Sequence, residues 1–485
     1  MTMSKKADVV VIGFGGAGAT AAIAAHDAGA SVIILEKAES GGGTTQESSG
    51  NIRIIADQDK AARHYCALTL GTTPLEVMRV FTHGISEIPG WIEKIGGQIQ
   101  PTPADPIKYF FPYIAPTTSY PDFVGSEGIG GRFAAKSEGD EGGGAALWRV
   151  LQKAVQQRKI EVVYNARATR LIKNDDGIVG VTARRSDGDI RVGANRGVVL
   201  ASGGFSYNAD MQRQFIGMEI AAFSPPGRNS GDGIKMAQDV GADLWHMSAA
   251  VAGFGYKVPG YEAAFCAGIL SEGFLIVDQN ARRYMNEAHV EFHSGLLSAQ
   301  VLDSVAGKRY RTPSFLIFDE KTRLSGPIAT RVKHSYNQRF KWSEDNSDEI
   351  EKGWITSGPS LGGLADKLSL PESELQATMN RFNAACKNGN DEFARDRNLM
   401  RPLQGPLYGI PIWPALSNTQ GGPRRNEKAQ VLDVFGNPIA RLYSAGELGS
   451  IWGQLYPGAG NVSECIVFGR IAGRNAAQEP SLRFV

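Results

Sequence analysis

The stretch Asp8-Val-Val-Val-Ile-Gly-Phe-Gly-Gly-Ala-Gly18 decides the fold of this 485-residue chain. Its first five residues are mostly β-branched and predict a buried parallel strand. The glycines that follow have the spacing G-x-G-x-x-G, and an alanine-rich helical stretch then ends at Gly29. In this pattern Gly13 permits a sharp turn, Gly15 lets the backbone approach a pyrophosphate, and Gly18 lets the helix pack on the strand.

A second strand and an acidic residue complete the pattern. Ser31 to Leu35 predict the strand, and Glu36 follows it, about twenty residues after the glycines, where a carboxylate accepts hydrogen bonds from a ribose. A lone glycine motif is weak, but here strand, turn, helix, strand and acid occur in order. The sequence therefore predicts a Rossmann-type dinucleotide site with phosphates at the helix start. This fingerprint alone does not separate FAD from NAD.

Composition excludes several classes of protein. The net charge is +1, with 42% apolar and 21% charged residues, so nothing indicates a nucleic-acid partner or an anionic membrane. The four cysteines (Cys66, Cys266, Cys386 and Cys465) form no Cys-x-x-Cys pair, so we expect no metal site. No apolar run reaches the ~18 residues of a membrane span, and no signal-peptide pattern is present. We therefore expect a soluble, cytoplasmic protein.

The order of the segments resembles the FAD-dependent fumarate reductase and 3-ketosteroid dehydrogenase superfamily over nearly the whole chain. The strongest matches are residues 8–50, 142–242 and 415–475. The resemblance implies FAD as the cofactor. It also implies non-covalent FAD, because covalent members use a histidine near Thr44, and none occurs between His26 and His64. Members move a hydride and a proton across a carbon–carbon bond next to an activating group.

The resemblance also implies the architecture. We expect an α/β fold in which a Rossmann-type FAD-binding domain, residues 1–244 and 388–485, carries an inserted α+β substrate (capping) domain at 245–387. In the insert, short strands at 274–277 and 314–318 alternate with helical stretches. No second G-x-G-x-x-G has a Rossmann context, so we expect no NAD(P)H domain and an electron partner that reaches the flavin directly.

The cofactor-contacting residues implied by the resemblance lie in small-residue segments along the chain. The run from Gly41 to Gly50 could otherwise be a solvated loop. The implied set is Gly13, Gly15, Gly16, Ala17, Gly18, Glu36, Lys37, Gly42, Gly43, Thr44, Thr45, Ser49, Gly50, Ala168, Ala201, Ser202, Gly203, Asn208, Asp232, Gly446, Glu447, Asn461 and Val462.

A C-terminal motif separates the subfamilies. Fumarate reductases carry N-R-L-G-G-N, whose arginine clamps a substrate carboxylate. Here the aligned stretch is Gln454-Leu-Tyr-Pro-Gly-Ala-Gly-Asn461, and its Y-P-G-A-G is similar to that of the ketosteroid 1-dehydrogenases. In those enzymes the tyrosine hydroxyl and the last glycine amide hold a ketone oxygen, which implies this role for Tyr456 and Gly460. Alternatively, Tyr456 is a packed aromatic beside a turn.

The base is less certain from the sequence. The family has a tyrosine shortly after its Asn-Glu motif, whereas no tyrosine follows Glu287 until Tyr310. His293 takes that place if two residues are inserted, and histidine suits general base catalysis near neutral pH. Glu291 takes it in a gapless alignment. Either residue could also lie on the surface.

Aromatic and basic residues near the motifs are further candidates. Aromatic residues of a proline-rich loop could line a substrate pocket or only hold the loop. Arginines near the motifs could bind a carboxylate or the cofactor phosphates, or be solvated. The aromatic set is Phe110, Phe111, Tyr113 and Tyr120, and the basic set is Arg53, Arg132, Arg424 and Arg425.

The sequence thus predicts an FAD-dependent dehydrogenase that desaturates a cyclic ketone, either a 3-ketosteroid or a smaller ring such as an oxocyclohexane derivative. The base takes the α proton and flavin N5 takes the β hydride. One alternative is a reductase of an unsaturated carboxylic acid of the fumarate or urocanate kind, with Arg424 or Arg425 as the carboxylate ligand. Another is a flavin electron-transfer subunit. The acceptor, whether quinone, oxygen or a carrier protein, stays open.

Overall fold

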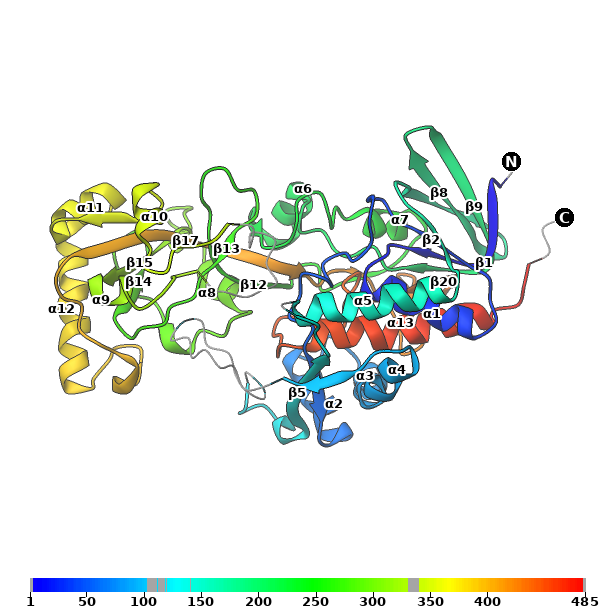
Figure 1. Cartoon of the computed structure of the whole chain (residues 1–485), viewed down its shortest axis with the longest axis horizontal. Helices are drawn as coiled ribbons and strands as arrows, with labels where there is room; N and C mark the ends of the chain where they lie inside the picture. The colour runs from blue at the N-terminus through cyan, green and yellow to red at the C-terminus, as the bar shows by residue number, and fades with distance from the viewer. Residues whose placement is uncertain are drawn as a thin grey trace.

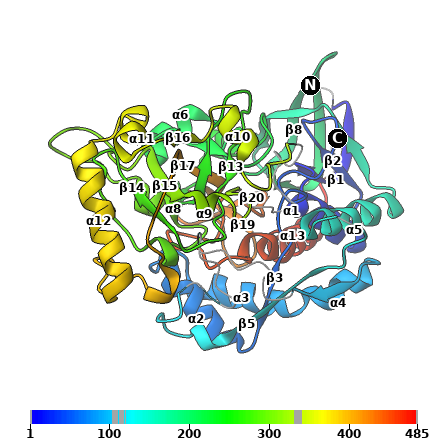
Figure 2. The same cartoon turned by 60° about the vertical axis from the view of Figure 1, so that its left-hand side comes forward.

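The computed structural model describes residues 3–102, 111, 118, 120–139, 141–329 and 340–482. They form two regions arranged along the long axis of the molecule, one built on the N-terminal Rossmann pattern and one, called the cap below, built around residues 250–419 (Figure 1). Figure 2 shows the same two regions after a rotation, with helix α12 at the far edge of the cap.

The Rossmann region contains an eight-stranded sheet. Strands β20, β9, β1, β2 and β6 are parallel neighbours in that order, β19 pairs antiparallel with β20, and the β7–β8 hairpin extends antiparallel from β9. The strands are β1 (Lys5–Ile12), β2 (Val32–Leu35), β6 (Glu161–Val163), β7 (Arg167–Asn174), β8 (Gly177–Arg185), β9 (Gly188–Leu200), β19 (Gln430–Leu432) and β20 (Pro438–Ser444).

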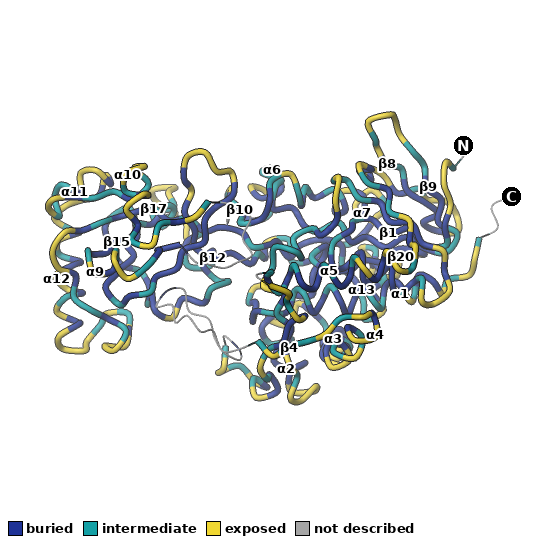
Figure 3. Tube along the Cα trace, in the orientation of Figure 1, coloured by how far each residue is buried: buried dark blue, intermediate teal, exposed yellow. Residues whose placement is uncertain are grey.

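Side chains of β1 alternate between the two faces of this sheet, which is why both faces are covered. Val9 and Val11 pack into the core formed by α1 (Gly16–Asp27), α5 (Gly143–Gln157) and α13 (Gly460–Gln478), three helices that lie along one face. Val10 and Ile12 join the core on the other face, with α7 (Asp232–Asp239). Figure 3 shows the second half of β1 as buried. The continuous apolar run at 8–12 therefore reflects a strand that is buried on both sides.

A smaller helical layer lies beneath α13 and supports its first turns. It contains a three-stranded antiparallel sheet in the order β3–β5–β4, and helix α3 contacts α13. Its elements are β3 (Ile52–Ile55), α2 (Gln58–Leu68), α3 (Leu75–Ser86), α4 (Ile88–Lys94), β4 (Ile99–Pro101), the 3-10 turn η1 (Ser126–Gly128) and β5 (Ile129–Ala135).

The cap has a seven-stranded sheet around one long strand, β17 (Leu407–Thr419). The order is β13–β12–β17–β15–β14, and β10 and β16 also pair with β17. The other elements of this part of the chain are β10 (Ala221–Ala222), β12 (Ala250–Tyr256), β13 (Phe265–Cys266), β14 (Phe274–Val277), η3 (Glu287–His289), α8 (Gly295–Ala299), β15 (Ser314–Asp319), α9 (Glu320–Arg323), α10 (Ser347–Glu351), β16 (Thr356–Gly358), α11 (Leu361–Leu368), α12 (Glu372–Asn388) and η5 (Arg397–Leu399).

Short segments connect the cap to the Rossmann region. The chain enters the cap after β11 (Leu244–Trp245) and leaves through β18 (Gly422–Pro423), and these two strands pair with each other. The remaining helical turns are α6 (Ala209–Met211) and η2 (Gln212–Ile216). β17 follows residue 387, the predicted end of the insert, so the cap sheet draws on residues beyond that limit.

The predicted fold class, an α/β Rossmann-type domain with an inserted mixed domain, is confirmed. The predicted strands at 8–12, 274–277 and 314–318 are present, and the predicted closing helix at 467–475 is the middle of the longer α13. In the part of the chain that the structure describes, no helix is both long and apolar enough to cross a membrane.

Candidate active site

The glycine loop between β1 and α1 has the geometry that its sequence predicts. Gly13 has φ +100°, and a Cβ atom there would lie 2.5 Å from the Ala201 carbonyl oxygen. A Cβ on Gly18 would lie 1.9 Å from the Gly13 oxygen, so helix and strand could not approach as they do. Beside this loop runs the 42–45 segment, where the Gly42 N–H donates to the Phe14 oxygen at 2.8 Å and the Thr45 hydroxyl accepts from the Gly16 N–H at 3.0 Å.

Gly15 differs from the other glycines of the loop. Its φ of −96° and ψ of −165° suit any residue, and a Cβ atom there would meet no protein atom closer than 3.8 Å. Neither backbone strain nor packing within the protein therefore requires glycine at this position. A ligand that lies against the backbone would require it.

A hollow of about 50 Å³ lies at the carboxyl ends of β1, β2 and β9 and brings several predicted cofactor residues together. The Glu36 carboxylate accepts from the backbone N–H groups of Phe14, at 2.7 Å, and Ala38, at 2.9 Å. These bonds hold Glu36 at the glycine loop. The predicted residues that line the hollow are Gly13, Glu36, Lys37, Ala168, Ser202 and Asp232.

Charged and polar partners order this hollow. Asp232 pairs with Arg167 at 2.7 Å and accepts from the Ser230 hydroxyl at 3.0 Å, while the Lys37 ammonium donates to Ser230 at 2.8 Å. Burial acts to raise the pKa of Asp232, but the bonds from Arg167 and Ser230 dominate and lower it. The Asn208 side chain accepts from the Met211 N–H and so caps α6. The sequence predicted a cofactor contact for Asn208 and not this structural one.

A larger cavity of about 240 Å³ lies between the Rossmann region and the cap. It collects the predicted Thr44, Thr45, Ser49, His293, Glu447, Tyr456, Asn461 and Val462 from four separate segments. Sequence reasoning missed the cap residues that close it, because no local pattern marks them. They are Phe223, Ser224, Val251, Cys266, Phe292, Ser417 and Asn418.

Glu447 is a carboxyl group at the wall of this cavity. Asn229 donates to it at 3.0 Å and the Thr419 N–H donates at 3.1 Å. Burial raises the pKa of the Glu447 carboxyl to about 7, although those hydrogen bonds act against the shift. The preceding Gly446 (φ +74°) lies against Ala17 of the glycine loop, so the two halves of the Rossmann region meet here.

Tyr456 has a different hydrogen-bond arrangement from the predicted one. Its hydroxyl oxygen accepts from the N–H groups of Gly460, at 2.8 Å, and Asn461, at 2.9 Å, at the start of α13. The Gly460 amide and the Tyr456 hydroxyl, both predicted to donate to a ketone, are therefore bonded to each other. The turn folds the Tyr456 ring back over the start of its own helix. The Tyr456 O–H remains as the donor that can reach the cavity. Burial raises the pKa of this phenol, so it stays neutral at neutral pH.

His293 and Glu291 act as one unit in the structure. The Glu291 carboxylate accepts from His293 Nδ1 at 2.7 Å and from the His293 backbone N–H at 2.6 Å. The His293 ring lies edge-on to the Tyr456 ring, with centroids 5.0 Å apart, and lines the cavity. With Nδ1 bonded to the carboxylate, Nε2 is the nitrogen left to accept a proton.

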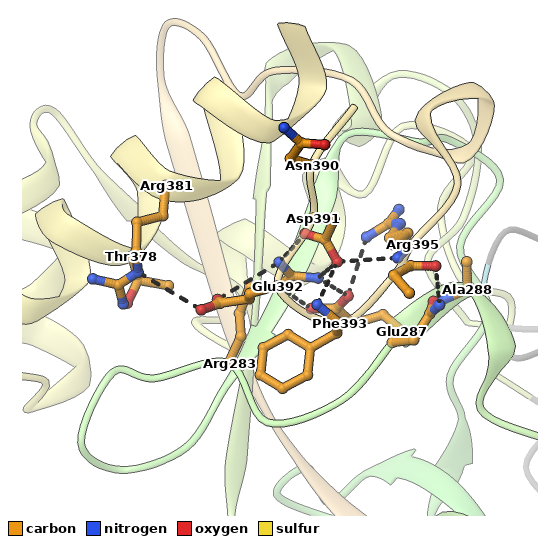
Figure 4. A network of polar contacts seen from close by, with 12 residues as sticks. Arg283, Glu287, Ala288, Thr378, Arg381, Asn390, Asp391, Glu392, Phe393 and Arg395 are labelled. Atoms are coloured by element: carbon orange, nitrogen blue, oxygen red, sulfur yellow. Dashed lines mark hydrogen bonds and ion pairs between the residues drawn. The ribbon is translucent and has the colours of Figure 1, made fainter. Parts of the chain in front are cut away.

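A buried ionic network anchors the segment that carries this pair (Figure 4). Glu287, four residues before Glu291, pairs with Arg283 at 2.7 Å and Arg395 at 3.5 Å, and it accepts from the Ile276 N–H at 3.2 Å. Arg283 also pairs with Asp391 at 2.5 Å. Breaking a buried ion pair leaves an uncompensated charge. The network therefore holds in place the segment that follows Glu287 and carries Glu291 and His293.

The structure settles where the candidate arginines and aromatics lie. Arg425 is buried against Glu464, and Arg424 pairs with Asp243, so neither lines the cavity. The lining residues that the structure describes include no arginine or lysine. Tyr120 bonds to Ser294, next to His293, at 2.7 Å, and Phe111 packs in the cap core. Phe110 and Tyr113 lie outside the described residues.

The donor set fits a flavin dinucleotide. Two buried hydroxyls, Ser202 in the smaller hollow and Ser224 in the larger cavity, have no hydrogen-bond partner among the described residues. Together with the open space at Gly15, they leave polar atoms and room for a ligand along one path. The path runs from the Glu36 carboxylate past the glycine loop to the cavity under the cap.

Comparisons with known proteins agree with this geometry. A 4-oxocyclohexanecarboxylate 2-dehydrogenase of Sinomonas cyclohexanicum is 27% identical, with 97% of this chain and 92% of that protein covered. An NADH:fumarate oxidoreductase of Klebsiella pneumoniae is 26% identical over 98% of this chain, which spans 48% of that protein's length. A 3-ketosteroid Δ1-dehydrogenase of Sterolibacterium denitrificans has the same fold, with a TM-score of 0.82 at 22% identity, covering 98% and 100% of the two chains.

The family model described as FAD binding domain matches residues 8–463, almost the whole chain. The relatives named above are dehydrogenases and reductases. The cofactor is thus FAD, and this chain belongs to the FAD binding domain family of oxidoreductases.

Proposed function

We propose that the chain is an FAD-dependent dehydrogenase that introduces a carbon–carbon double bond next to the carbonyl of a cyclic ketone. The observation that carries this proposal is the convergence of His293, held by Glu291, and Tyr456 at one cavity. A base and a neutral hydroxyl donor, placed side by side, are what removal of a proton next to a carbonyl requires.

Each residue has a separate role in the reaction. The Tyr456 O–H donates to the ketone oxygen and stabilises the negative charge that develops on it. His293 Nε2 takes the α proton, and Glu291 orients the ring and stabilises the imidazolium that forms. The bonds from Gly460 and Asn461 hold the phenol oxygen, so the amides act on the ketone through Tyr456. FAD, when bound, supplies the hydride acceptor.

The cofactor residues have proposed places along the path. Glu36 and Asp232 lie at the ribose end, the glycine loop lies at the phosphates, and the cavity wall from Thr44 to Val462 surrounds the reactive ring. We propose that FAD is held without a covalent bond. Precipitation of the protein with acid distinguishes non-covalent from covalent FAD. Yellow colour in the supernatant supports non-covalent FAD, and yellow colour in the pellet contradicts it.

Anaerobic reduction of the enzyme-bound flavin tests the proposed activity. A panel of 3-ketosteroids and monocyclic ketones, including oxocyclohexane derivatives, is mixed with the enzyme in the absence of oxygen. Bleaching by a ring ketone, with a new conjugated enone in the product, supports the proposal and gives the ring size. Quinone, oxygen or a carrier protein is then tested as the acceptor.

Two alternatives make different predictions in the same experiment. A reductase of an unsaturated acid oxidises pre-reduced flavin with that acid and shows no turnover of any ketone. The absence of a described arginine or lysine at the cavity weighs against it. In a flavin electron-transfer subunit, no small-molecule donor bleaches the flavin, and electrons pass only to a partner protein.

A further inference from the structure

Arg53 is a buried cation directly behind the Tyr456 turn. It lies on β3, two residues after the cavity-lining Asn51, and is 2% exposed. Its guanidinium donates to the carbonyl oxygens of Pro457, at 2.8 Å, and Gly458, at 3.3 Å. One planar side chain therefore holds two consecutive carbonyls of the turn that carries Tyr456.

The same turn brings Arg53 close to His293. A Cβ atom placed on Gly458 would lie 3.5 Å from Arg53 Nη2 and 3.2 Å from His293 Cε1. Both groups thus lie within 3.5 Å of the position that a Gly458 side chain would take. Gly458 has φ +75°, a conformation that favours glycine, and any side chain here would enter this gap.

The charged groups around the two rings have opposing effects. His293 is faced by the Glu291 carboxylate, the Tyr456 phenol and the Arg53 guanidinium. Tyr456 is faced by Arg53, whose charge lowers the phenol pKa, and by Glu464, whose charge raises it, while burial raises it most.

We propose that Arg53 is a positioning residue that clamps the Tyr456–Gly460 turn and so fixes Tyr456 beside His293. The clamp keeps the Tyr456 hydroxyl on the Gly460 and Asn461 amides. This inference rests on the proposed function of the same site.

Two variants separate the clamp from the charge. Arg53→Lys keeps the charge but loses the planar fork, and Arg53→Met loses both. Arg63→Met, on α2 and exposed, is the matched control, because it removes an arginine of a surface ion pair with Asp59. All are purified with FAD bound, and FAD content is checked by absorbance. The readouts are kcat, KM and the NMR signal of the Tyr456 side chain.

The Tyr456 signal is measured by NMR on holoenzyme with ¹³Cζ-labelled tyrosine, and Tyr456→Phe assigns it. Both arginine variants are expected to shift this signal, because the turn that holds the hydroxyl on the Gly460 and Asn461 amides moves. They are also expected to lower kcat by about 10- to 100-fold with little change in KM. Arg63→Met keeps the wild-type signal and kcat.

An unshifted Tyr456 signal in both arginine variants overturns the proposal. If Arg53→Met does not fold, Arg53→Lys still decides, because wild-type kcat in that variant overturns the clamp. A merely structural arginine would lower the melting temperature and leave the Tyr456 signal and kcat unchanged. The NMR measurement needs no substrate, so it tests Arg53 even if no ring ketone is turned over and the proposed function fails.

Discussion

Two glycine-containing turns begin the two helices that pack against each other in the Rossmann region. The turn at 13–18 begins α1, and the turn at 456–460 begins α13. At the first turn, Gly15 faces open space. At the second, a side chain of the turn itself, Tyr456, accepts from the first two helix amides. The first turn is left open for a ligand, whereas the second has its amides occupied by the group that we propose to act on the substrate.

The largest expected effect is at the base beside the second turn. His293→Gln removes the proton acceptor and is expected to lower kcat by about 10³-fold, within the usual range for general base catalysis. Flavin absorbance stays at the wild-type level. Turnover is measured with the ketone that bleaches the flavin. Substantial residual activity would mean that another group is the base. Glu291→Gln is then the next variant to compare.

Tyr456→Phe breaks the second turn directly. It removes the donor to the ketone oxygen and is expected to lower turnover by about 10²-fold or more, as loss of one oxyanion donor does. The variant also frees the Gly460 and Asn461 amides. If those amides then hold the ketone oxygen themselves, the measured loss is small and the side-chain donor is dispensable. Steady-state kinetics at fixed pH decides between these outcomes.

Glu447 lines the same cavity as Tyr456, and it makes stability depend on pH. Because burial raises the pKa of this carboxyl to about 7, the folded FAD-free protein holds a proton that the unfolded chain releases near pH 4.5. Stability from this group is therefore present below pH 4.5 and is lost as pH rises to about 7, by about 3 kcal/mol. Urea unfolding of the FAD-free protein measures this. Glu447→Gln is expected to flatten the dependence of the free energy of unfolding on pH. An unchanged slope would show that other groups cause this dependence.

Gly15→Ala sharpens the contrast at the first turn. A Cβ atom there meets no protein atom within 3.8 Å, so the fold tolerates it, but it is expected to weaken FAD binding by about tenfold. The control is Gly29→Ala, which follows the same helix. Gly29 has φ +86° and open space around it, so alanine there is expected to lower stability by about 1 kcal/mol and leave FAD binding unchanged. Flavin titration and thermal melting read the two effects separately.

The first turn could be predicted from the sequence, and much of the second could not. The glycine loop and Glu36 follow local rules of spacing, and Glu36 does contact the loop. The Glu291–His293 pair stayed open as two alternatives, because a bond between residues two apart depends on a turn that no periodicity marks. Arg53 meets Pro457 across 404 residues, a contact that only the assembled fold creates. The cap residues that line the cavity were missed for the same reason.

Strand β17 makes one further property of the molecule explicit. Its pairing with β15 begins at Leu407, in the cap, and its other end supplies Ser417 and Asn418 to the cavity and Thr419 to the Glu447 carboxylate. A hydrogen-bonded strand is stiff along its length. One strand therefore runs from the outer cap to the cavity wall. We expect substitutions in the outer cap, far from any reacting atom, to alter the cavity through this strand, which the absorbance of the bound flavin would report.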